Sequence, residues 1–84
     1  MNFIDRYDNL ARIAQYIRFE KTGNPKELAK KCEISLDTLH DQIDILRQIA
    51  ARDFAQIKYC RVRETYYFKP SGRFANFEFL TDNA

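Results

Sequence analysis

The sequence is poor in the residues from which catalytic and metal sites are built. It has one histidine, two cysteines and two glycines among its 84 residues. No pair of Cys or His residues has the spacing of a metal site, and two glycines are too few for a loop that cradles phosphate. Because the groups that an active site needs are missing, we expect no enzyme activity, no metal site and no cofactor.

Disulfides and membrane spans are equally unsupported. Cys32 and Cys60 are too few for a disulfide framework, so we interpret both as reduced thiols of an intracellular protein, with at least one in the core. No apolar run approaches the length of a membrane span, and the N-terminal residues do not have the pattern of a signal peptide. We therefore expect a cytoplasmic protein with no membrane partner.

What the sequence does have is a high aromatic content and a nearly balanced charge. Five Tyr and seven Phe supply large buried areas, and 84 residues suit one folded domain spanning residues 1–84. The net charge of +2 is by itself a weak sign of a nucleic-acid partner. Residues 51–84 carry six basic and four acidic side chains, so the largest basic excess lies in the last third of the chain.

The first two thirds of the chain have helical periodicity. Apolar residues recur at three- and four-residue spacing, as on the buried face of an amphipathic helix. Gly23 follows the first such segment, where a residue with positive φ ends a helix at low cost. The pattern predicts helices at about 3–20, 25–32 and 36–52.

The signals between these helices indicate a helix-turn-helix unit at about 25–52. Asn24, Pro25 and Glu27 form the pattern of a capping box, and Ser35 is a good N-cap for the third helix. The alternative is an ordinary corner between two helices. The capping box, the helix lengths and the segment that follows favour the helix-turn-helix, which leaves the outer face of its second helix free to enter a major groove.

After residue 55 the period changes to that of strands. The segment 57–61 alternates and the segment 65–68 is aromatic and β-branched, which together predict a β-hairpin wing at about 57–69. A C-terminal strand or tail follows at about 73–80. The expected fold is α+β, a winged helix-turn-helix in which a three-helix bundle precedes the wing. We expect the core to include Leu10, Leu28, Leu39, Ile43, Leu46, Ile57 and Tyr67.

Two segments resemble the amino-terminal DNA-binding domains of DeoR-type and WYL-type bacterial transcriptional regulators. Residues 25–35, PKELAKKCEIS, are similar to the ELAxxLGIS run of these families, and Thr38, Leu39, Ile43 and Leu46 continue it. Residues 57–67, IKYCRVRETYY, are similar to the wing of the WYL-type group. The resemblance implies a winged helix that binds double-stranded DNA and regulates transcription. Those families usually attach a sensor domain after the wing; here we expect a stand-alone domain with no small-molecule ligand.

The chain departs from that pattern at two places in the backbone. Glu33 stands where the family usually has Gly, at a turn position that tends to need positive φ. A non-glycine residue there carries roughly 1 kcal/mol of strain. Residues 52–55 look like an insertion of about one helical turn before the wing.

A third departure concerns the recognition helix. At about 100° per residue, Asp37, Asp41 and Asp44 fall opposite the apolar stripe of this helix, on the side that DNA would approach. An acidic face opposes the phosphate backbone, although an Asp can accept a hydrogen bond from cytosine. Two alternatives stay open, weakened DNA binding or a protein partner docked on the acidic helix. The candidate DNA-reading residues are Ser35, Asp37, Thr38, His40, Asp41 and Asp44.

The wing has the opposite charge. Lys58, Arg61 and Arg63 are predicted to contact phosphates beside the groove. The alternative is a hairpin edge whose charges merely prevent aggregation.

The aromatic segment near the C-terminus suggests self-association. Phe74, Phe77 and Phe79 alternate along a strand that either folds back on the wing or pairs with a second copy. Because two recognition helices match two half-sites, we expect a homodimer with these three residues in its contact.

Overall fold

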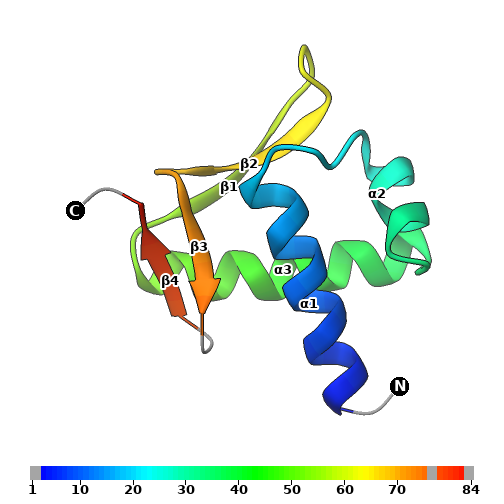
Figure 1. The fold of residues 1–84 in the computed structure, drawn as a ribbon, viewed down its shortest axis with the longest axis horizontal. Coiled ribbons are helices and arrows are strands. Elements are labelled where there is room, and N and C mark those ends of the chain that lie inside the picture. The colour runs from blue at the N-terminus through cyan, green and yellow to red at the C-terminus, as the bar shows by residue number, and fades with distance from the viewer. Residues whose placement is uncertain (1–2, 76–77, 83–84) are drawn as a thin grey trace.

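Three helices are followed by two antiparallel β-hairpins (Figure 1). The structure is a computed structural model that describes residues 3–75 and 78–82. The expected α+β class is confirmed, and the order of elements is that of a winged-helix-like fold. The elements are α1 (Phe3–Arg18), α2 (Pro25–Lys31), α3 (Leu36–Arg52), β1 (Gln56–Cys60), β2 (Thr65–Lys69), β3 (Gly72–Ala75) and β4 (Glu78–Thr81).

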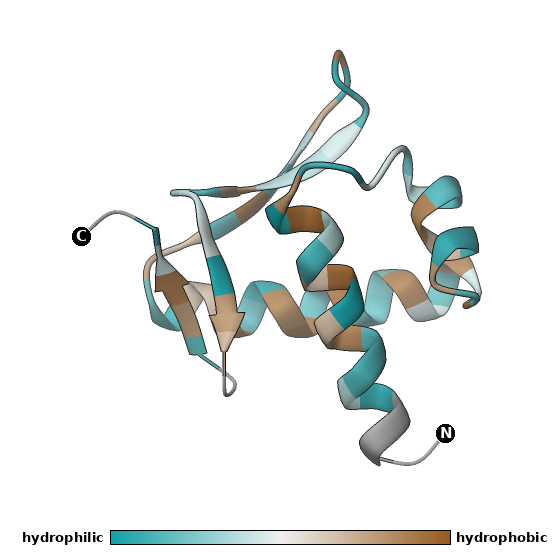
Figure 2. Cartoon of the chain, in the orientation of Figure 1, coloured by the Kyte–Doolittle hydropathy of each residue, from teal (hydrophilic) through white to brown (hydrophobic). Residues whose placement is uncertain are grey.

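The elements form a thin slab with extents of 35 × 33 × 16 Å. In Figure 1, α1 crosses in front of α3, α2 lies beside one end of α3, and the hairpins lie toward the other end. Hydrophobic and hydrophilic residues alternate along α1 and α3 in Figure 2, as amphipathic helices require. In the part of the chain that the structure describes, no helix has both the length and the apolar character needed to cross a membrane.

The helix starts follow the capping signals of the sequence. Asn24 Oδ1 accepts a hydrogen bond from the Glu27 amide at 2.9 Å, and the Glu27 carboxylate accepts one from the Asn24 amide at 3.3 Å. Ser35 Oγ accepts from the Thr38 amide at 3.1 Å. These bonds satisfy amides that have no partner inside their helices, so they fix where α2 and α3 begin.

Each helix ends in the same way, with a non-glycine residue in the left-handed region. The φ angles are 54° at Glu20, 56° at Glu33 and 61° at Phe54. The amide of the next residue bonds back to a carbonyl five residues earlier, over 3.0, 3.0 and 2.9 Å respectively. This is the Schellman arrangement. The positive φ expected at Glu33 is confirmed, whereas α1 ends at Arg18 and is closed by Glu20, three residues before Gly23.

One hydrophobic core joins the helices to both hairpins. The predicted core residues Leu28, Leu39, Ile43, Leu46 and Ile57 are at most 5% exposed. Cys32 is also buried, as expected of one thiol, and Leu10 packs on the core while partly buried.

The prediction for Tyr67 was wrong, because the strand presents its other face to the core. Ile57 pairs with Phe68 and Tyr59 with Tyr66. Tyr66 is therefore the buried tyrosine, at 7% exposed, while Tyr67 pairs with Lys58 on the outer face.

The C-terminal aromatic segment forms a second hairpin instead of a third strand on the wing. Strand β3 pairs with β4, with Phe74 opposite Phe79. The rings of Phe68, Phe74 and Phe79 meet edge to face, with centroids 5.1 to 5.5 Å apart. At Gly72 an added Cβ would lie 2.4 Å from the Leu80 carbonyl oxygen, so only glycine permits this close approach.

Relief of the strained turn after α2 should stabilise the protein. We expect Glu33→Gly to raise the free energy of unfolding by about 0.5–1 kcal/mol, because glycine adopts positive φ without a steric cost. Chemical denaturation measures the change. The matched control, Lys30→Gly inside α2, should lower the same quantity by about 1 kcal/mol. Loss of stability in Glu33→Gly as large as in the control would contradict the assignment of strain.

Candidate nucleic-acid interface

The outward face of α3 is acidic and exposed. Asp37, Asp41 and Asp44 are all exposed, opposite the buried Leu39, Ile43 and Leu46. Their placement agrees with the helical angles of the sequence. Of the three, Asp44 pairs with Arg47 at 3.5 Å, and both side chains are about half exposed or more. An exposed pair of this kind is weak, so the face keeps much of its negative charge.

The remaining candidate residues on α3 have different surroundings. His40 is exposed, whereas Thr38 is partly buried. The Ser35 hydroxyl accepts the Thr38 amide and also donates to Thr38 Oγ1 at 2.9 Å. Ser35 is exposed, but its hydroxyl and that of Thr38 are engaged in the N-cap, whereas the aspartates and His40 are turned to solvent.

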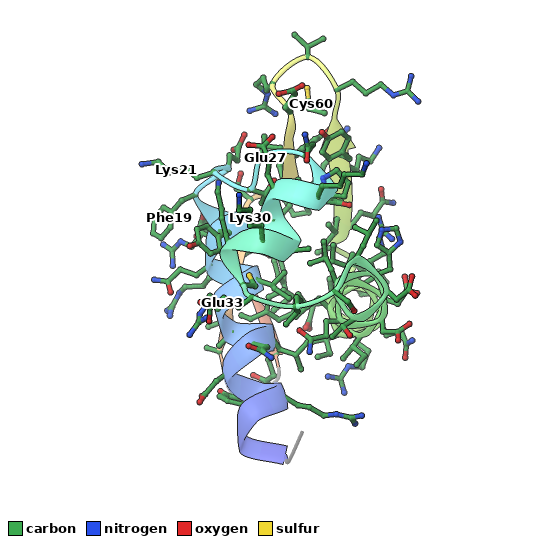
Figure 3. The ribbon with its side chains drawn as sticks, turned by 90° about the vertical axis from the view of Figure 1, so that its right-hand side faces the viewer. Phe19, Lys21, Glu27, Lys30, Glu33 and Cys60 are labelled. Atoms are coloured by element: carbon green, nitrogen blue, oxygen red, sulfur yellow. The ribbon has the colours of Figure 1, made fainter. Side chains whose placement is uncertain are left out.

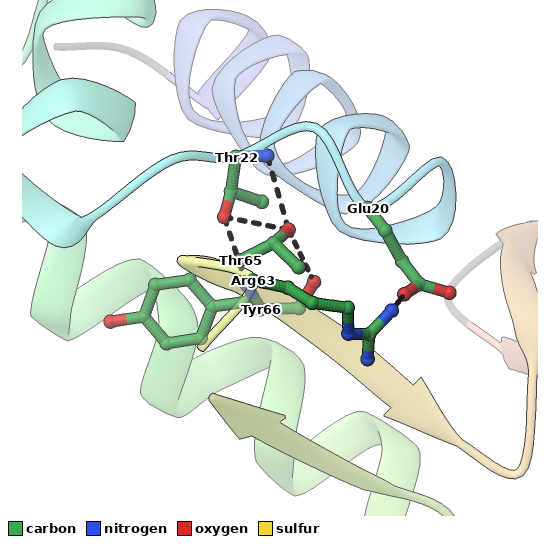
Figure 4. Close-up of polar contacts among 5 residues, drawn as sticks. All are labelled: Glu20, Thr22, Arg63, Thr65 and Tyr66. Atoms are coloured by element: carbon green, nitrogen blue, oxygen red, sulfur yellow. Dashed lines mark hydrogen bonds and ion pairs between the residues drawn. The ribbon is translucent and has the colours of Figure 1, made fainter. Parts of the chain in front are cut away.

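The wing presents two of its three predicted phosphate contacts. Lys58 and Arg61 are exposed, and within the described ranges 3–75 and 78–82 neither forms an ion pair. Arg63 is engaged within the chain. Its guanidinium pairs with Glu20 just after α1 (Figure 4) and also lies over the Tyr67 ring, 5.2 Å from the centroid. A phosphate would have to compete with these partners.

A buried hydroxyl network attaches the wing to the connection between α1 and α2. Thr22 and Thr65 are 0% and 3% exposed, and their hydroxyls are 3.1 Å apart (Figure 4). The Tyr66 amide donates to Thr22 Oγ1 at 2.8 Å, and the Thr22 amide donates to Thr65 Oγ1 at 3.3 Å. Each of these buried amides therefore has an acceptor, which fixes the start of β2, next to the wing tip, against the connection that follows α1.

The two thiols have different chemistry. Hydrogen bonds from Arg63 lower the pKa of the Cys60 thiol. The bond from the Arg63 backbone has the larger effect and the bond from the Arg63 side chain the smaller one. Burial raises the pKa of the Cys32 thiol. Cys60 is partly exposed beside the wing tip, so it is the more reactive of the two.

The predicted dimer residues lie mainly inside one chain. Phe79 is 3% exposed, and Phe74 is partly buried against it, because the β3–β4 hairpin turns both rings toward Phe68. Phe77 lies outside the described residues. Phe79 therefore has no exposed ring to offer a second copy in this fold, and self-association stays a prediction.

Sequence reasoning misses a cluster of aromatic and basic residues at the end of α1. Phe19 is 56% exposed, and the Arg18 guanidinium lies over its ring at 5.3 Å. Lys31 lies over the Tyr16 ring at 5.5 Å. The signal in the sequence is that Phe19 sits among charged residues, outside the apolar stripe that carries Ile13 and Ile17.

Comparison of the chain with family models, with curated proteins and with solved structures gives no match. In the described part of the chain, no three His, Cys, Asp or Glu side chains gather as ligands for a metal ion.

The environment of Cys60 predicts a pH-dependent alkylation rate. When the rate of alkylation by iodoacetamide is plotted against pH, we expect the midpoint for Cys60 to lie at a lower pH than that of a free cysteine, because Arg63 stabilises the Cys60 thiolate. Arg63→Ala should raise this midpoint only part of the way toward the value of a free cysteine, because the hydrogen bond from the backbone of residue 63 remains. Peptide mass spectrometry across a pH series measures both thiols. Cys32 serves as the internal control and should stay unreacted in the folded protein; a Cys60 midpoint at or above that of free cysteine would refute the contact.

Proposed function

We propose that this chain binds double-stranded DNA as a small transcriptional regulator, in the manner of the DeoR-type and WYL-type domains that its sequence resembles. The α2–α3 unit supplies a helix with an outward face, and the β1–β2 hairpin supplies a wing. Such an arrangement suits a helix in the major groove with a wing on the adjacent backbone.

The observation that carries the proposal is that two exposed cations on the wing, Lys58 and Arg61, form no ion pair with the residues that the structure describes. Lys58 points away from the core, since it alternates with the buried Ile57, and Arg61 lies in the exposed turn at the tip. Both side chains can meet phosphate without breaking a contact described in the chain. Arg63 contributes by holding the wing to α1 rather than by reaching DNA.

The acidic face of α3 sets the expected strength and specificity. Three exposed aspartates repel phosphate, so binding to duplex DNA is weak and depends on the wing. The carboxylate of Asp41 can only accept hydrogen bonds, so it favours the amino group of cytosine over the N7 and O6 acceptors of guanine.

A second function is favoured by exposed apolar residues beside that acidic face. Leu36 is 37% exposed and Ile45 is 40% exposed, and at about 100° per residue they flank the three aspartates on either side. Apolar side chains that flank carboxylates suit a protein partner with both apolar and basic residues. In this alternative, α3 docks a protein and duplex DNA binding is absent.

Removal of the two wing cations tests the DNA proposal. Lys58→Ala with Arg61→Ala should weaken binding to any duplex and flatten the slope of log K against log salt by about 1.8, for two lost phosphate contacts. Fluorescence anisotropy over a salt series measures the slope. The matched control is Arg12→Ala with Lys21→Ala, which removes the same charge from exposed positions on and just after α1 and should leave most of the slope in place. An equal effect from both pairs would contradict a wing contact.

Charge reversal on α3 separates the two functions. Asp41→Arg should raise affinity for duplex DNA, because attraction replaces repulsion at the groove-facing position. The matched control is Glu78→Arg on β4, which gives the same change in net charge. No duplex binding by the native protein, together with no selective gain in Asp41→Arg, would overturn the DNA proposal and leave the protein-docking alternative.

A further inference from the structure

A second charged surface lies on the opposite side of the molecule from the acidic face of α3. We call it the α1–α2 patch and define it by Arg12, Tyr16, Phe19, Lys21 and Lys31. Figure 3 shows Phe19 and Lys21 at the side of the molecule away from α3, which is seen end-on in green. The two broad faces of the slab thus carry opposite charge.

The charge of this patch is net positive. Between residues 12 and 31 there are six basic residues, Arg12, Arg18, Lys21, Lys26, Lys30 and Lys31, and two acidic ones, Glu20 and Glu27. Both acids are already engaged, Glu20 with Arg63 and Glu27 with the Asn24 amide. Arg12 and Lys21 are exposed and form no ion pair with the residues that the structure describes. Glu27 keeps its negative charge while it caps α2, and Glu33 adds another exposed acid, so an anionic partner meets a surface whose charge is mixed but net positive.

The patch also has an exposed aromatic ring that borders hollows in the surface. Phe19 is 56% exposed, at the end of α1. It lines a hollow of about 350 Å³ together with Arg12, Gln15, Tyr16 and Lys21. It also lines a second hollow on the side of Leu10 and Phe74, where the Arg18 guanidinium lies over the ring at 5.3 Å. A planar group can therefore stack on the ring opposite Arg18, or displace that side chain, without a rearrangement of the backbone.

Lys31 holds the patch together. Its ammonium donates to the Lys21 carbonyl at 2.8 Å and to the Thr22 carbonyl at 3.4 Å, and lies 5.5 Å from the centre of the Tyr16 ring. These contacts fix the end of α2 to the segment that follows α1. The Tyr16 ring and the backbone at Lys21 are thereby fixed before any partner binds, which lowers the ordering cost of binding.

We propose that the α1–α2 patch binds single-stranded nucleic acid, with phosphates on Arg12 and Lys21 and a base stacked on Phe19. Alternating cations and exposed rings are the features that single-strand sites use, since bases stack on aromatic side chains while basic groups follow the backbone. A duplex keeps its bases stacked internally and offers such a ring nothing to bind. The site is separate from the α3 and wing surface, so it goes beyond the proposed duplex binding and does not depend on it.

The test is fluorescence anisotropy with labelled oligothymidylate and oligouridylate of about a dozen nucleotides, and with a duplex of equal length. Phe19→Ala should weaken single-strand binding by about tenfold, which is the loss of one stacked base, and leave duplex binding unchanged. Arg12→Ser with Lys21→Ser should lower the single-strand salt slope by about 1.4. Equal binding of the two oligomers would indicate a site that does not read the 2′-hydroxyl; either preference is compatible with stacking.

Matched controls and competitors complete the experiment. Phe54→Ala removes a ring that is even more exposed, 93% against 56%, at the far end of α3, and Lys69→Ser removes a cation outside the patch; both variants should bind single strands as the native protein does. The Lys58 and Arg61 double variant should lose duplex binding and keep single-strand binding, so the two proposals fail separately. Unchanged binding in Phe19→Ala, or displacement by oligoglutamate as effective as by oligothymidylate, would overturn the proposal.

Discussion

The buried contact between Thr22 and Thr65 is the constraint on which the arrangement of this small domain depends. The two residues are 43 positions apart and almost without exposure, and their hydroxyls take up the amides of Thr22 and Tyr66. Through this contact the wing is attached to the end of α1 as well as to the core. The Arg63–Glu20 pair lies beside the network and uses the same approach of the wing to α1 (Figure 4).

That attachment decides which charges face solvent. Arg63 and Glu20 are paired with each other, so the wing offers Lys58 and Arg61 as its unpaired cations, and the charge of Glu20 is turned toward the wing. The acids of α3 remain on the opposite face. A slab 16 Å thick thus carries a negative helix face on one side and a positive aromatic patch on the other, with a basic hairpin projecting at one edge. For an anionic partner, the patch and the wing are favourable surfaces and α3 is not.

Local signals account for the features that the sequence predicts well. The helices, their caps and the positive φ at Glu33 depend on neighbouring residues, and the acidic face of α3 follows from the helical period. Tyr67 was misassigned because the run from Thr65 to Phe68 is apolar at three successive positions and has no alternation to mark a face. The packing of the second hairpin and the ion pair of Arg63 with Glu20 depend on contacts between distant segments. Composition and residue spacing do not predict such contacts.

A double-mutant cycle on Thr22→Val and Thr65→Val tests the central claim, that the hydroxyl network fastens the wing to the helices. Valine keeps the shape of threonine, so each change removes hydrogen bonding and leaves a buried amide without its acceptor, which should lower the free energy of unfolding by about 1–3 kcal/mol. The account predicts that the double variant loses at least about 0.5 kcal/mol less than the sum of the single variants, because the two hydroxyls act as one network. Additive losses in chemical denaturation would contradict it.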